Sequence, residues 1–177
     1  MPEKKVVVFC SASYDIDPEY NALAREVIHE LCALGYAIVS GGTVKGTMGV
    51  VAEETARLGG THIGVLPRFM SQVVYPGLTE VVWTDTMSGR KESMRGGVCA
   101  AIALPGGIGT LDELIETLVL AKLDLFKGGV YALNYKDFYR PFIQLLDHYV
   151  DTGMLDRRTR ELIRFPSDPK ELADLLK

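Results

Sequence analysis

The sequence predicts one α/β domain over residues 1–177, with a doubly wound parallel sheet and helices on both of its faces. Short apolar runs of strand length alternate with segments of helical period along the chain, which is typical of right-handed βαβ units. The first run is apolar at consecutive positions, as in a strand that is covered on both faces. A chain of 177 residues leaves no room for a second domain.

The expected elements follow one another with recognisable start and stop signals. After the β-branched run at residues 5–10, Asp17 and Pro18 supply an N-cap and a first helical position, and Gly35 ends that helix. The remaining strands are expected at residues 36–40, 61–66, 80–84, 100–104 and 130–134. The remaining helices are expected at 47–58, 138–150, 156–163 and 169–176, with one more that holds Asp112 and Glu113 in its first turns and continues over 114–126. Residues 68–79 show no clean period. This order describes a Rossmann-like domain.

The composition argues against several partners and locations. A formal charge of −4 and a pI near 5.4 disfavour nucleic acid and anionic membranes as partners. No apolar run approaches the roughly 20 residues of a membrane helix, and the first strand begins too early for a signal peptide, so we expect a cytoplasmic protein. The three cysteines and three histidines form no ligand cluster, so no metal is expected. The GxGxxG fingerprint of dinucleotide-binding proteins does not follow the first strand, which argues against NAD or FAD, so no cofactor is expected.

The most informative stretch is the apolar run at residues 100–104, which leads through Pro105 and a glycine cluster into a helical pattern. A strand, a tight turn and a helix start form an anion site, because the first N–H groups of a helix have no partner within it. The candidate phosphate ligands are Gly106, Gly107, Gly109 and Thr110. Glu113 follows closely and would act on water or on a cationic transition state. Alternatively, the acids only complement the helix dipole and the glycines only form the turn.

Arg90 and Lys91 form a second candidate group, after the strand at residues 80–84. The Arg90 guanidinium offers a planar fork of donors suited to ribose hydroxyls or phosphate, and Lys91 adds a mobile charge. A solvated helical face is the commoner outcome for an arbitrary pair, but this pair lies at the sheet edge where ligands bind. We expect Arg90 and Glu113 to meet over one ribose from different loops. Met87 and Met94 flank the pair and could contact a flat base or simply pack.

Two further segments reach the same edge of the predicted sheet. Ser11-Ala12-Ser13 follows the first strand. The glycine-rich loop at residues 41–49 lacks the lysine of a Walker A loop. Its glycines would admit a ligand to the backbone or let the next helix pack tightly on the sheet, and the pattern leaves both roles open.

Three segments together carry a family resemblance. They are Gly41-Gly42-Thr43-Val44-Lys45-Gly46-Thr47-Met48-Gly49, Met87-Ser88-Gly89-Arg90-Lys91-Glu92-Ser93-Met94 and Pro105-Gly106-Gly107-Ile108-Gly109-Thr110-Leu111-Asp112-Glu113. In this order they resemble the GGGxxGLMG, MHxRKxxM and PGGxGTxxE elements of the LOG family, cytokinin-activating phosphoribohydrolases whose members are often labelled lysine decarboxylases. The resemblance implies ligand contact for Gly42 and Thr43. It also places four more residues with the substrate: Ile108, Leu111, Asp112 and Glu116.

Two departures from the family pattern bear on substrate choice. Ser88 stands where histidine is usual, and residues 69–78 offer no carboxylate where a substrate-contacting glutamate is expected.

The residues and the resemblance predict a hydrolase that cleaves the N-glycosidic bond of a purine nucleoside 5′-monophosphate, with Arg90 and Glu113 as catalytic residues. By the resemblance, the substrate is AMP or an N6-modified AMP such as a cytokinin riboside 5′-monophosphate, and the products are the free base and ribose 5-phosphate. The alternative is a nucleotide-binding or sensing module that uses the same site without turnover. Lysine decarboxylase is disfavoured because no lysine has an evident Schiff-base setting.

The helix expected at residues 114–126 carries a wider apolar surface than one face of a sheet needs. We therefore expect a homodimer that uses this helix, with Leu118 at an outward position.

Overall fold

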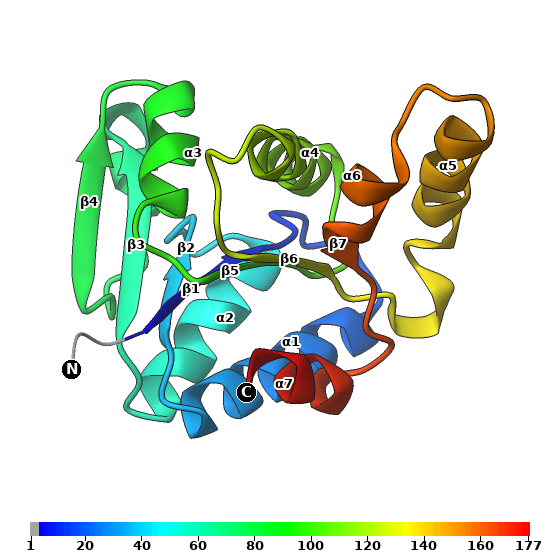
Figure 1. Ribbon diagram of the computed structural model, residues 1–177. Helices are drawn as coiled ribbons and strands as arrows, with labels where there is room; N and C mark the ends of the chain where they lie inside the picture. The colour runs from blue at the N-terminus through cyan, green and yellow to red at the C-terminus, as the bar shows by residue number, and fades with distance from the viewer. Residues whose placement is uncertain (1–3) are drawn as a thin grey trace.

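The structure is a computed structural model that describes residues 4–177, and these contain one sheet of seven parallel strands (Figure 1). The strands are β1 (Lys5–Phe9), β2 (Ala37–Ser40), β3 (His62–Pro67), β4 (Glu80–Thr84), β5 (Ala100–Ala103), β6 (Gly129–Ala132) and β7 (Ile163–Arg164). Their order in space is β4-β3-β2-β1-β5-β6-β7. The prediction of a Rossmann-like parallel sheet is confirmed.

The chain changes its direction of travel across the sheet between β4 and β5. It adds β2, β3 and β4 in turn on one side of β1, and then places β5 on the other side. Val7 of β1 is consequently in register with both Val39 of β2 and Ala101 of β5. In open parallel sheets, ligands bind outside the carboxyl ends of the strands at such a switch point. The loops after β1 and β5 are therefore the place to look for a site.

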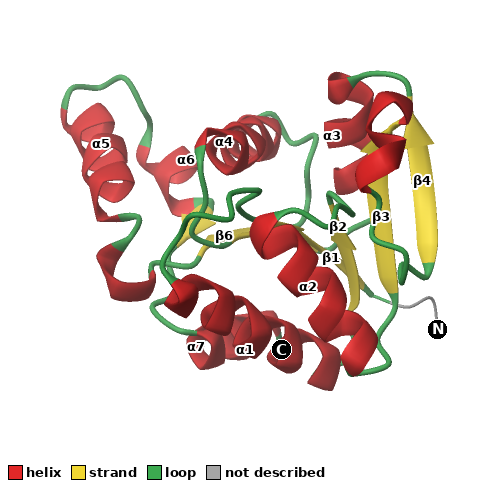
Figure 2. Cartoon of the chain, turned by 180° about the vertical axis from the view of Figure 1, so that it is seen from behind, coloured by secondary structure: helices red, strands yellow, loops and turns green. Residues whose placement is uncertain are grey.

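Helices cover both faces of the sheet (Figures 1 and 2). They are α1 (Pro18–Ala33), α2 (Gly46–Arg57), α3 (Met87–Arg95), α4 (Ile108–Lys122), α5 (Arg140–Asp151), α6 (Arg157–Glu161) and α7 (Pro169–Leu176), with short 3-10 turns η1 (Arg68–Val73) and η2 (Tyr135–Asp137). α1, α2 and α7 lie on one face, whereas α3, α4 and α6 lie on the other. None of the helices within residues 4–177 is both long and apolar enough to cross a membrane.

Each face of the sheet has its own apolar core. Successive side chains of β1 alternate between them: Val6 and Val8 pack with α1 and α7, whereas Val7 and Phe9 pack with α4. All four side chains are at most 1% exposed. Burial on both sides explains why the strands read as continuous apolar runs rather than as alternating ones.

The predicted boundaries of α1 are confirmed. The Asp17 carboxylate accepts a hydrogen bond from the Glu19 N–H at 3.0 Å, and Pro18 occupies the first turn. Gly35 follows the helix with a φ of 78°, a left-handed conformation that favours glycine.

Other expectations are wrong at the ends of elements. α4 ends at Lys122 rather than at residue 126, because Asp124 adopts a φ of 62° and the chain turns back there. Leu118, expected to point outward, is 5% exposed and belongs to the core beneath α4. The helix expected at 156–163 stops at Glu161, and Ile163–Arg164 pair with β6 instead. A two-residue edge strand is too short to leave a pattern in the sequence.

Candidate active site

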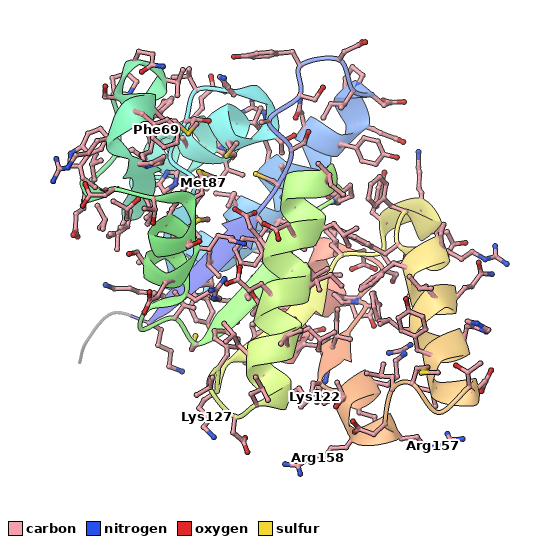
Figure 3. All side chains as sticks on the ribbon, turned by 90° about the horizontal axis from the view of Figure 1, so that it is seen from above. Phe69, Met87, Lys122, Lys127, Arg157 and Arg158 are labelled. Atoms are coloured by element: carbon pink, nitrogen blue, oxygen red, sulfur yellow. The ribbon has the colours of Figure 1, made fainter. Side chains whose placement is uncertain are left out.

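A cavity of about 350 Å³ lies at the switch point, where the chain leaves β1 and β5. Its walls come from the end of β1 with the loop after it, the glycine loop after β2, η1, α3 and the start of α4. The lining residues are Val8, Phe9, Cys10, Ser11, Ala12, Ser13, Gly41, Thr43, Lys45, Met48, Met70, Met87, Arg90, Met94, Gly107, Gly109, Thr110 and Glu113. Figure 3 shows α3 and α4 next to each other, with Met87 where α3 begins. Both predicted catalytic residues line this cavity.

Glu113 supplies the carboxyl group of the cavity from α4. Burial raises the pKa of Glu113 to about 7, although the positive charge of Arg90 opposes the shift. A carboxyl with such a pKa exchanges a proton readily near neutral pH, which is what a general base or acid requires.

Arg90 reaches the cavity from α3, where it is 6% exposed. Its Nε–H donates to the Val65 carbonyl at 2.9 Å and an Nη2–H donates to the Gly41 carbonyl at 3.3 Å. A Cβ at Gly41 would lie 2.2 Å from Nη2, so only glycine leaves room for this guanidinium. Burial lowers the pKa of Arg90 and Glu113 opposes that shift, yet arginine stays charged at neutral pH. Arg90 lies within a helix rather than on the expected loop, whereas Glu113 lies in the first turns of α4, as the helical pattern after the glycine cluster predicts.

The turn between β5 and α4 has the features of an anion site. Gly107 is the N-cap of α4 and offers no side chain to the first N–H groups of the helix. Gly107, Gly109 and Thr110 line the cavity. The Thr110 hydroxyl oxygen is buried without a hydrogen-bond partner in the described part of the chain. Free backbone N–H groups, the positive end of the helix dipole and an unpaired hydroxyl converge here, as phosphate binding requires.

Gly106 belongs to this turn but does not line the main cavity. A Cβ at Gly106 would lie 2.2 Å from the Thr110 hydroxyl oxygen. Gly106 and Gly107 also line a smaller neighbouring cavity of about 200 Å³.

The structure places several expected substrate contacts outside the cavity lining. The Lys91 Nζ lies 2.9 Å from an Asp112 carboxylate oxygen and 2.6 Å from one of Glu116. An Nη2 atom of Arg95, a residue that the sequence did not single out, lies 2.9 Å from the other Glu116 oxygen. Lys91, Asp112 and Glu116 therefore form ion pairs between α3 and α4.

Three more expected contacts also lie elsewhere. Gly42 has a φ of 66°, and a Cβ there would lie 2.7 Å from the Gly64 Cα, so this glycine permits close packing on β3. Ile108 is 83% exposed, and Leu111 is half-buried on α4. Thr43, by contrast, is buried and lines the cavity.

A buried histidine holds the glycine loop. His62 Nε2 lies 2.7 Å from the Ser40 hydroxyl oxygen, which also accepts a hydrogen bond from the Gly42 N–H at 3.1 Å. Burial lowers the pKa of His62 to about 4, so the ring is neutral at physiological pH. Its role is to fix the loop after β2.

Sequence reasoning missed part of the cavity wall. Met48 and Met70 join Met87 and Met94 to make four methionines, whose flexible apolar side chains suit a flat ring. Met48 lies within the glycine-loop motif, so a signal for it was present in the sequence. Met70 belongs to η1, in the segment without a period, and only the fold brings it to the cavity.

The fold and the cavity define a class: a Rossmann-type α/β protein with a glycine turn at a helix N-terminus beside a buried arginine and a carboxyl. A family model described as "Possible lysine decarboxylase" matches residues 48–176. The chain belongs to the LOG family, as its similarity to cytokinin riboside 5′-monophosphate phosphoribohydrolases shows.

Two such relatives illustrate the similarity. The enzyme LOG of Oryza sativa subsp. japonica is 34% identical over 172 residues, which cover 96% of this chain and 71% of that protein. The enzyme of Rhodococcoides fascians is 32% identical over 163 residues, covering 90% of this chain and 82% of that protein. The molybdenum cofactor binding protein of Rippkaea orientalis has a similar fold, with a TM-score of 0.76, 19% identity and coverage of 99% and 96%.

Proposed function

We propose that the protein hydrolyses the N-glycosidic bond of a purine nucleoside 5′-monophosphate, AMP or an N6-modified AMP, and releases the base and ribose 5-phosphate. The observation that carries the proposal is the shared cavity: Arg90 and Glu113 line it together with the uncapped turn at Gly107. The names of the relatives, which are cytokinin riboside 5′-monophosphate phosphoribohydrolases, support this substrate class.

The chemistry needs three groups, and the cavity supplies each. Gly107, Gly109 and Thr110 hold the 5′-phosphate and thereby fix the position of the ribose. The bond between C1′ and the base nitrogen breaks with its electron pair leaving on the base, so C1′ becomes cationic in the transition state. The Glu113 carboxylate stabilises this charge and accepts a proton from the water whose oxygen joins C1′.

Arg90 performs a positioning and electrostatic role in the same step. Its two bonds to the Val65 and Gly41 carbonyls fix the plane of the guanidinium. A fixed cation next to the ribose orients its hydroxyls and stabilises the negative charge that develops on the departing base. The base takes up a proton from solvent, which completes the hydrolysis.

Lysine decarboxylation, which the description of the family model names, does not fit this cavity. Pyridoxal phosphate needs a Schiff-base lysine and a partner for its pyridine nitrogen. Lys45, the one lysine that lines the cavity among residues 4–177, is partly exposed at the N-cap of α2 and lacks the buried setting that activates a Schiff-base lysine.

The proposal is tested by incubating the purified protein with AMP, N6-modified AMP and the matching nucleosides, and measuring the free base by mass spectrometry. We expect the monophosphates to react faster than the nucleosides by orders of magnitude, because phosphate contacts contribute several kcal/mol of transition-state binding. Equal rates for AMP and adenosine would contradict the role of the turn. Tight nucleotide binding without base release would instead favour a sensing module.

A further inference from the structure

α3 brings Arg90 to the cavity, yet little apolar surface holds this helix to the sheet. Three of its nine residues are buried, and two of these are the arginines Arg90 and Arg95. Met94, the third, packs in the core beneath α4. The position of α3 therefore depends strongly on the polar contacts of its arginines.

Arg95 makes such a contact with α4. Its side chain is 7% exposed, and its Nη2 lies 2.9 Å from a carboxylate oxygen of Glu116. Lys91 bridges the Glu116 and Asp112 carboxylates from the preceding turn of α3. Burial alone would raise the pKa of Glu116, but hydrogen bonds from Lys91 and Arg95 hold this pKa below its ordinary value. Glu116 is consequently ionised at neutral pH, and the ion pair is formed.

The contact is placed next to the catalytic groups. Glu116 follows Glu113 by one helical turn on the same face of α4. Arg95 lies five positions after Arg90 on α3. A partly buried ion pair that loses one partner is costly, so the contact between Arg95 and Glu116 constrains the two helices beside the cavity.

We propose that Arg95 is a positioning residue, whose ion pair with Glu116 holds α3 against α4 and so sets the separation of Arg90 and Glu113. The inference rests on the proposed function, in which those two residues act on one ribose. Arg95 is not among the residues that line the cavity. It acts through Arg90 and Glu113.

Arg95 also acts on Glu113 through space. Burial raises the pKa of Glu113, Arg90 lowers it, Asp112 raises it, and Lys91 and Arg95 lower it. The Cys10 thiol, which faces the cavity from the end of β1, has its own pKa raised by burial and stays neutral. Loss of the Arg95 charge therefore raises the pKa of Glu113, and the acid limb of activity moves to higher pH because the carboxylate is the active form.

The test compares Arg95→Met and Arg95→Lys with a matched control, Arg25→Met. Arg25 of α1 pairs with Glu54, a buried glutamate of α2, on the opposite face of the sheet. The measurements are kcat, KM and the pH profile with the nucleotide that the wild type hydrolyses. A titration of the ¹³C-labelled Glu113 carboxyl, assigned by its absence in Glu113→Gln, runs in parallel.

We expect Arg95→Met to lower kcat by roughly ten- to a hundredfold, as small misplacements of catalytic groups do, with KM changed by less than about threefold. Its acid limb should lie at higher pH than the wild-type limb. Arg95→Lys, which keeps the charge, should restore the limb and part of kcat. Arg25→Met should leave kcat and the limb unchanged.

An Arg95→Met variant with wild-type kcat and an unmoved limb overturns the inference. If the wild type releases no base from any nucleotide, the proposed function fails. The titration of the Glu113 carboxyl then tests the role of Arg95 independently of activity. If the titration midpoint of Glu113 rises in Arg95→Met and returns in Arg95→Lys, the result supports the inference that Arg95 acts on Glu113. An unmoved midpoint overturns it.

Discussion

Arg90 and Glu113 differ in how the fold holds them. Arg90 is fixed by two backbone carbonyls, whereas the Glu113 carboxyl has its pKa raised by burial to about 7 and keeps its proton exchangeable. Under the proposed function, Arg90 orients the ribose and Glu113 transfers the proton, and each role can be removed by one substitution.

At the residue scale, we predict that Glu113→Gln lowers kcat by roughly a hundredfold or more and leaves nucleotide affinity largely intact, because the amide keeps the shape but not the charge. Arg90→Ala should weaken both affinity and rate. The double variant should be little worse than the poorer single variant, as is usual for groups that act as a unit. Single-turnover kinetics and calorimetric titration with the nucleotide measure these effects.

Wild-type turnover in Glu113→Gln would contradict the catalytic role of Glu113. Glu116 could not take over the role of Glu113 from its present position, because Lys91 and Arg95 form ion pairs with the Glu116 carboxylate. If the free-energy losses of the two single variants add in full in the double variant, Arg90 and Glu113 act independently.

At the element scale, the start of α4 depends on a glycine that does not line the main cavity. A Cβ at Gly106 meets the Thr110 hydroxyl at 2.2 Å, whereas a Cβ at Gly109 meets no atom within 4 Å. We predict that Gly106→Ala destabilises the fold by about 1–3 kcal/mol, the usual effect of overpacking, and raises KM for the monophosphate. Gly109→Ala should keep the wild-type melting temperature. Thermal unfolding of both variants tests this, and equal melting temperatures would contradict it.

The sequence predicted the strands that carry an apolar run and missed the elements that only tertiary contacts define. β1 and β5 carry continuous apolar runs, and the turn after β5 carries its glycines in a recognisable motif. α3 left no such signal, because its buried residues include Arg90 and Arg95 rather than an apolar stripe. Without α3, the sequence could not show that Lys91 faces Asp112 and Glu116 across two helices.

The same limit explains the wrong orientation of Leu118. The apolar surface of α4 is wide enough that sequence alone does not tell which side meets the sheet. The fold buries Leu118 and leaves Ile115 37% exposed and Val119 48% exposed. Leu123, the C-cap residue of α4, is 59% exposed.

At the scale of the whole molecule, we propose that this exposed face of α4 joins two chains into a homodimer. Val119→Glu should then yield a monomer, because burying a carboxylate at an apolar contact is costly. Leu145→Glu is the matched control, since Leu145 of α5 is 44% exposed and lies on another helix. Sedimentation at micromolar concentration measures the state of each variant, and a monomeric wild type would contradict the proposal.

The walls of the main cavity come from parts of the chain that are separate in sequence. Gly107, Gly109, Thr110 and Glu113 belong to one turn and one helix, whereas Met48, Met70 and Met87 come from α2, η1 and α3. Under the proposed function, the methionine segments contact the base and the turn at Gly107 holds the sugar phosphate. Substitutions in the methionine segments should therefore change which base is accepted while the anchor for the sugar phosphate stays intact.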